Sequence, residues 1–311
     1  MKKKNQLLAA LAVGLIAGPL VAQAQYKYEV FDHPDADGIQ VFGINDHGDV
    51  VGNVTDEVGG TPFVYDSKTG TVTDVAPSAG HSDTGVLASN DAGVMVGSVL
   101  DLTETMTSGF IRDKQGNYTI VDHPLGVGFT QFRGVNNKGL VTGFRGDASV
   151  NTIGFIYDPK SNTFTDLNPT SWFTIAQGIN SKGEVVGSSN FIPETDPCPG
   201  LGNPFLRYGW LRATDGTVTY FEVNGSHSSG RGINDQGSIV GFFIDLTDGN
   251  FKGYKAELDG TQCQSLTLGP SDILDVPGTN ETIAAGINNA GDISGGTSFG
   301  DTSIGFIARP N

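Results

Sequence analysis

The sequence predicts an all-β fold, a six-bladed β-propeller built from four-stranded blades. Three observations predict it: a motif that recurs six times, a high glycine content, and partial repeats at the two ends that complement each other. Glycine makes up 45 of the 311 residues, about twice the usual share. Glycine weakens helices and suits turns, and residues 25–311 show no clear helical period.

The repeated motif is Gly-Ile-Asn-x-x-Gly-x-Val-Val-Gly, seen in full at 43–52. Five copies are well kept and the copy around Asn90 is worn. The motif asparagines are Asn45, Asn90, Asn136, Asn180, Asn234 and Asn288, at intervals of 44 to 54 residues. A fixed repeat of this length is typical of propellers and solenoids.

Each repeat predicts four strands. The first ends at the asparagine, the Asn-x-x-Gly step is a tight turn in which glycine takes positive φ, and the second strand carries Val-Val-Gly. The third strand holds an aromatic residue, in turn Phe63, Phe110, Phe155, Trp210, Tyr254 and Phe306. The fourth is β-branched or aromatic and often ends in Asp-x-Pro, where proline terminates the ladder.

The two ends of the chain complete one repeat. Residues 28–34 have the pattern of a fourth strand without its first three, and residues 304–308 that of a third strand without a fourth. We therefore expect the N-terminal strand to pair into the last blade and close the ring, since an open solenoid would need polar caps instead.

The repeats resemble the HAF family of extracellular repeat proteins over essentially all of 25–311. The Gly-Ile-Asn-x-x-Gly-x-Val-Val-Gly element carries the resemblance. The His-Ala-Phe tripeptide of that family survives only as the phenylalanine, for example in Thr61-Pro62-Phe63. The resemblance implies an exported bacterial β-repeat protein and supplies no catalytic residues.

Residues 1–24 predict a signal peptide. Lys2, Lys3 and Lys4 precede an apolar run from Leu7 to Val21, which is followed by a small-x-small cleavage site. The run is too short to span a bilayer, so we expect the domain 25–311 to be exported without a membrane span, to the periplasm or the medium, as a monomer.

The predicted mature chain is strongly acidic. Loss of the three lysines leaves 15 basic against 34 acidic residues, a net charge of −19. Phosphate backbones bind basic surfaces, so a nucleic-acid partner is not expected. Solubility alone is a sufficient reason for such a charge.

The loops sort onto two faces. The links between fourth and first strands and between second and third strands share one face, here named the long-loop face, and the tight turns occupy the other. Acidic residues gather on the long-loop face, Asp35 and Asp37 among them. Calcium is the one cofactor this suggests, because it takes carboxylate ligands; the spacing of a calcium loop is absent, and a solvated rim explains the acids equally.

Two further features are candidate contacts. Trp172 and Phe173 precede a first strand, where an exposed aromatic pair would stack on a sugar ring and a buried pair would pack in the core. The ring of turn asparagines would line one mouth of the channel, although turn chemistry alone accounts for it. Cys198 and Cys263 lie in expanded loops, and a disulfide in an oxidising compartment requires these loops to meet at the outer rim.

Two functions remain open. The first is a non-enzymatic exported protein that presents its acidic long-loop face to a glycan or a surface protein. The alternative is a hydrolase or lyase acting on an extracellular polysaccharide, with acids and histidines converging over the channel. The candidate histidines are His33, His81, His123 and His227. An enzyme would gather a His or Arg with at least two carboxylates in the axial pocket, and no residue is assigned as catalytic.

Overall fold

The computed structural model describes residues 26–55, 60–103, 105–167, 172–191, 196–201 and 207–311. The predicted signal peptide 1–24 lies outside the described residues. Within these ranges the only helical element is a single 3₁₀ turn, η2 (Pro199–Leu201), and the all-β prediction is confirmed. None of the described helices has the length and hydropathy that crossing a bilayer requires.

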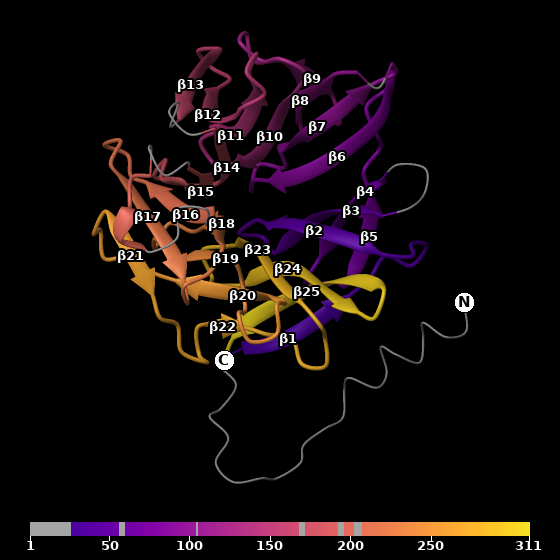
Figure 1. Ribbon diagram of the computed structural model, residues 1–311. Helices are drawn as coiled ribbons and strands as arrows, with labels where there is room; N and C mark the ends of the chain where they lie inside the picture. The colour runs from indigo at the N-terminus through magenta and orange to yellow at the C-terminus, as the bar shows by residue number, and fades with distance from the viewer. Residues whose placement is uncertain (1–25, 56–59, 104, 168–171, 192–195, 202–206) are drawn as a thin grey trace.

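The strands form four-stranded antiparallel units that follow the predicted repeats (Figure 1). One parallel pair, Thr152 opposite Phe173, joins the third and fourth units into a single larger sheet. The first units are β2 (Ile39–Ile44), β3 (Asp49–Val54), β4 (Pro62–Asp66) and β5 (Thr71–Asp74); β6 (His81–Ser89), β7 (Met95–Asp101), β8 (Thr107–Arg112) and β9 (Tyr118–Val121); and β10 (Thr130–Val135), β11 (Val141–Gly146), β12 (Thr152–Asp158) and β13 (Thr163–Leu167). The next are β14 (Phe173–Ile179), β15 (Val185–Asn190), β16 (Arg207–Arg212) and β17 (Val218–Val223); β18 (Ser228–Ile233), β19 (Ile239–Ile244), β20 (Phe251–Ala256) and β22 (Ile273–Leu274); and β23 (Thr282–Ile287), β24 (Ile293–Phe299) and β25 (Thr302–Pro310), which β1 (Tyr26–Phe31) joins.

The units follow one another around a common centre (Figure 1). The first strand of each unit contacts the second strand of the preceding one: β6 contacts β3, β10 contacts β7, β14 contacts β11, β18 contacts β15, β23 contacts β19, and β2 contacts β24. β1 pairs antiparallel with β25 from Tyr26 opposite Pro310 to Phe31 opposite Gly305. The two ends of the described chain therefore lie side by side.

The glycine of Val-Val-Gly is required by close packing. A Cβ on Gly187 would lie 2.0 Å from the backbone oxygen of Ile175 and 2.5 Å from the ring of Trp210. Every predicted third-strand aromatic is at most 1% exposed and faces such a glycine across the strand pair, as Trp210 faces Gly187. The repeat motif thus fixes the packing within each unit. Clusters of buried side chains between neighbouring units pack the sheets against one another.

Cys198 and Cys263 form a disulfide with Cα atoms 5.7 Å apart. The insertion between β20 and β22 carries β21 (Cys263–Leu266), which pairs parallel with β17, the outer strand of the preceding unit. The insertion therefore crosses the outer rim, which is how two loops that start on opposite faces meet.

Breaking this disulfide should destabilise the protein. The bond closes a loop with a sequence separation of 65 residues, and removing a cross-link of that span frees the unfolded chain at a cost of about 2–4 kcal/mol. We expect a Cys198→Ala/Cys263→Ala variant to lose that much in urea unfolding, with β21 released first. Equal stability of the variant and the oxidised protein would contradict this expectation.

Candidate functional site

The turn asparagines satisfy their own turns. In each unit Oδ1 accepts backbone N–H groups two and four residues ahead; for Asn136 these belong to Lys138 at 3.0 Å and Leu140 at 2.9 Å. The following glycine has positive φ, 85° at Gly139. The turn prediction is confirmed at these positions. It explains the side-chain oxygen Oδ1 of each asparagine but not the side-chain nitrogen Nδ2.

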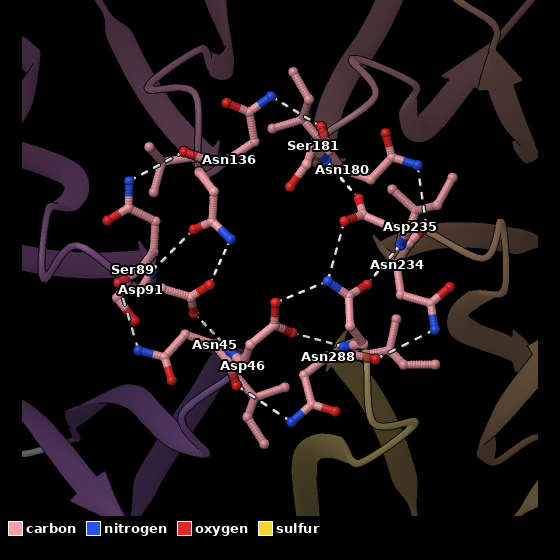
Figure 2. A pocket seen from close by; sticks show the side chains of 18 residues that line it. Asn45, Asp46, Ser89, Asp91, Asn136, Asn180, Ser181, Asn234, Asp235 and Asn288 are labelled. Atoms are coloured by element: carbon pink, nitrogen blue, oxygen red, sulfur yellow. Dashed lines mark hydrogen bonds between the residues drawn. The ribbon is translucent and has the colours of Figure 1, made fainter.

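The side-chain nitrogen of each asparagine joins neighbouring units. Nδ2 of each asparagine donates to the backbone oxygen of the asparagine in the next unit, at 2.9–3.5 Å. The bonds run from Asn45 to Asn90, Asn90 to Asn136, Asn136 to Asn180, Asn180 to Asn234, Asn234 to Asn288, and Asn288 to Asn45. Figure 2 shows this cycle around the pocket that it lines.

A second set of hydrogen bonds lies inside this cycle, nearer the centre of the view in Figure 2. Asp46, Asp91 and Asp235 each accept a backbone N–H from a neighbouring unit at 2.7–2.8 Å. Asn137 and Asn289 also donate side-chain N–H groups to these carboxylates. Within the described ranges no group of three or more His, Cys, Asp or Glu is arranged to hold a metal ion. The polar groups at this mouth are therefore occupied in holding the units together.

A central chamber lies behind the asparagines. It has a volume of about 80 Å³ and shares with the turn-side pocket the residues just before the asparagines: Ile44, Ser89, Val135, Ile179, Ile233 and Ile287. The chamber is lined next by Phe42, Leu87, Arg133, Gln177, Arg231 and Ala285. In every first strand the pairing register shifts at that residue, and such a β-bulge re-aims a side chain, here into the chamber.

Two of these six residues are arginines. Nε of Arg133 and Nε of Arg231 are buried without a hydrogen-bond partner. Arg133 donates from Nη2 to Gln131 at 3.1 Å. Among the described ion pairs none includes either arginine. Both side chains are surrounded by protein and keep part of their surface toward the chamber.

Aromatic rings on the adjacent strand support the guanidinium groups. Arg133 lies over Phe144 at 5.1 Å, and Arg231 lies over Phe242 at 5.1 Å. Burial lowers the pKa of each arginine to about 10, and for Arg231 the charges of Arg133 and Arg207 act in the same direction. Both groups remain charged at neutral pH, so the chamber is positive in an acidic protein.

The chamber continues to the long-loop face. A pocket of about 320 Å³ shares Phe42, Arg231 and Ala285 with it. Its polar lining includes Gln40, Ser298 and Ser303, and its single carboxylate is Glu281. The channel therefore offers an open end lined by hydroxyl and amide groups and an inner end lined by arginine.

The four candidate histidines do not converge on the channel. His33 Nε2 lies 2.8 Å from Asp74, and His123 Nε2 lies 3.2 Å from Asp166. Nδ1 of each accepts the backbone N–H two residues on, so both Asp-His-Pro steps are equivalent structural corners. His81 contacts Ser78, and His227 accepts from the backbone of Arg207.

Titration of His123 should weaken the fold on acidification. The pKa of His123 lies below its usual value, and burial is the largest cause. The charge of Asp166 opposes this shift, and the charge of Arg145 adds to it. The unfolded chain therefore binds this proton first, so the contribution is complete above about pH 6.5 and declines below it. We expect His123→Gln to lose less unfolding free energy than wild type between pH 7 and pH 5 in urea titrations.

His47→Gln is the matched control, because His47 is exposed at a turn tip. This variant should retain the wild-type loss between the two pH values. If His123→Gln also retained the full loss, the assignment to His123 would be wrong.

The residues singled out from the sequence lie apart. Asp35 and Asp37 are exposed in the link between β1 and β2. Trp172 is 48% exposed, with its ring 5.9 Å from that of half-buried Phe173. Phe173 in turn lies under the guanidinium of Arg207 at 4.9 Å. The aromatic pair is therefore accessible at the long-loop face, in a different unit from the two aspartates.

Sequence reasoning missed the channel arginines. Both occur three residues before a turn asparagine, and a phenylalanine stands eight residues after each of those asparagines, at 144 and 242. Alignment of the repeats on their asparagines exposes this pairing, because the other four units have no arginine at the first position and small or polar residues at the second.

No family model matches the chain, and no curated protein matches it. Among solved structures it is similar to TolB from Acinetobacter baumannii, with 12% identity and a TM-score of 0.54 over 72% of this chain and 53% of that one. It is also similar to the tricorn protease, with 16% identity and a TM-score of 0.52 over 84% and 25%. The chain thus spans about half the length of TolB. The likeness concerns the fold alone: an all-β chain with propeller-like neighbours.

Proposed function

We propose that the chain is a six-bladed β-propeller of the HAF repeat type, closed by β1 beside β25, and that it is an exported, non-enzymatic protein that binds an extracellular glycan at its long-loop face. The β1–β25 pairing and the contact of β2 with β24 support closure. The cycle of hydrogen bonds from Asn45 through Asn288 and back to Asn45 supports six equivalent units arranged in a ring. The pattern of residues 1–24 supports export.

The observation that carries the binding role is the position of exposed apolar side chains. Leu102, Met106, Leu125, Val127, Val150, Trp172 and Leu246 are all at least 40% exposed. Each belongs to a segment that joins second to third or fourth to first strands, so they share the long-loop face with Asp35 and Asp37. Exposed apolar side chains that share one face of a protein make that face a candidate contact surface.

The alternative of a hydrolase or lyase has less support. The central chamber contains two arginines and no carboxylate, and its open end combines Arg231 with Glu281 alone. The histidines are engaged in corners and loops away from both pockets. An extracellular protein in place of a glycan remains the second type of partner for the same face.

A thermal-shift screen tests the proposal. The purified protein would be heated with acidic and neutral polysaccharides, with and without calcium, and a bound glycan should raise its melting temperature. A variant with Leu102→Ser, Leu125→Ser, Val150→Ser and Leu246→Ser should lose that shift and keep its own melting temperature. Absence of any shift would contradict glycan binding, and cleavage products appearing over hours would contradict the non-enzymatic role.

A further inference from the structure

The fold does not require arginine at the two chamber positions, because neutral residues occupy the equivalent positions in other units. The bulge position holds Leu87 and Ala285 in other units, and the strands there pair in the same way. A buried guanidinium without a counter-charge costs stability. Repetition therefore supplies an internal comparison: the fold accepts leucine or alanine at this position, and arginine is the costlier choice.

The arginines are held ready for a ligand. Phe144 and Phe242 each support one guanidinium from the adjacent strand. The positions equivalent to these two rings in the other units hold Asn53, Ser98, Ser188 and Gly296. Each aromatic thus occurs only where the arginine does. A stacked guanidinium loses little freedom when it binds an anion.

The open end of the channel defines the rest of the ligand. Gln40, Ser298 and Ser303 offer amide and hydroxyl groups beside the half-buried apolar side chains of Phe42 and Ile283. Alternating polar and apolar contacts of this kind suit a sugar ring, which has hydroxyl groups at its edge and C–H groups on its faces. The cavity volume is about 80 Å³ in the central chamber and about 320 Å³ at the open end. The chamber is therefore large enough only for a small group such as a carboxylate, and the open end alone reaches the size range of small-molecule sites.

We propose that the channel binds an acidic saccharide, with the carboxylate of a uronic acid accepting hydrogen bonds from Arg133 and Arg231 and the sugar ring lying in the open end at the long-loop face. This inference rests on the proposed glycan-binding function and names the class of glycan. Carboxylate and guanidinium form charge-assisted hydrogen bonds, the strongest available to either group. Ile44 and its equivalents, which are apolar except for Ser89, line the inner end of the site.

Isothermal titration calorimetry at fixed ionic strength tests this site. The probes are glucuronate, galacturonate, mannuronate and guluronate, each beside its neutral hexose, with sodium sulfate as a simple anion. We expect at least one uronate to bind about tenfold or more tightly than its neutral hexose. Arg133→Leu and Arg231→Leu should each remove that preference.

One further variant and one further measurement separate binding from folding. Glu281→Gln should strengthen uronate binding a few-fold, because it removes the single carboxylate that lines the open end. Without ligand, Arg133→Leu and Arg231→Leu should melt at or above the wild-type temperature, because Leu87 occupies the same position in another unit. A marked loss of melting temperature in both would assign the arginines to the fold and overturn the inference.

The remaining outcomes are decisive in different ways. Equal binding of uronates and neutral hexoses, unchanged in the arginine variants, would overturn the acidic-saccharide site and leave glycan binding at the face intact. Sulfate binding as tightly as every uronate would reduce the site to one for simple anions and overturn the saccharide assignment. No binding of any saccharide, together with no thermal shift by polysaccharides, would overturn both proposals.

Discussion

Replacement of Asn136 by alanine is expected to lower the free energy of unfolding by about 2–4 kcal/mol. The side chain is 3% exposed, and its removal takes away the acceptor of the Lys138 and Leu140 N–H groups and one of the two donors to the carbonyl of Asn180, which keeps the N–H of Gly183. Each hydrogen bond lost contributes about 0.5–1.5 kcal/mol, and a buried group left unpaired costs more. Urea unfolding followed by tryptophan fluorescence and circular dichroism measures the loss.

The neighbouring Asn137→Ala is the control for this prediction. Asn137 is exposed and bonds only to Asp91 among the described residues, so we expect a loss of less than about 1 kcal/mol. Asn136→Asp should also be strongly destabilising, since it keeps the acceptor and removes the donor to Asn180. If the two asparagines proved equivalent, the cycle would not hold the units together.

Gly295→Ala is expected to cost at least about 3 kcal/mol or to prevent folding. A Cβ at this position would lie 2.1 Å from the backbone oxygen of Ile283 and 2.6 Å from the ring of Phe306. Neither can move freely, because Ile283 belongs to β23 and Phe306 is fully buried in β25. Strand β25 also pairs with β1, so the substitution should also weaken the pairing between the two ends of the described chain.

Gly296→Ala tests the same prediction one residue further on. The nearest atom to a Cβ at Gly296 is 4.0 Å away, and its backbone needs no positive φ. The change should alter stability by less than about 1 kcal/mol. Similar destabilisation by the two substitutions would show that loss of glycine in the strand, rather than the close approach at Gly295, limits stability.

The features predicted correctly from the sequence are those encoded locally. The Asn-x-x-Gly turn depends on hydrogen bonds within five residues, and its glycines have the expected positive φ, as at Gly139. The buried third-strand aromatic and the Val-Val-Gly glycine recur in register because each unit packs in the same way. The β1–β25 pairing joins residues at opposite ends of the chain, and it was anticipated only because the end segments are complementary fragments of one repeat.

The features of the candidate site escaped prediction because they are non-local or depart from the repeat. The Nδ2 bonds of the asparagines join residues 44 to 54 positions apart, or 243 for Asn288 and Asn45, and no local pattern encodes them. Arg133 and Arg231 occur in only two of the six units, so a motif defined by what the units share omits them. Their direction into the channel depends on a β-bulge, which sequence periodicity does not reveal. The Cys198–Cys263 disulfide, by contrast, was predicted from the sequence and is confirmed, and the pairing of β21 with β17 shows how the two loops meet at the rim.

A crystal structure of the protein with the tightest-binding uronate tests the central claim most directly. The account predicts the sugar carboxylate within hydrogen-bonding distance of the guanidiniums of Arg133 and Arg231, with its ring between Phe42 and Ser298 in the open end of the channel. A uronate bound only elsewhere on the surface, or the two arginines paired with a carboxylate of the protein itself, would contradict it.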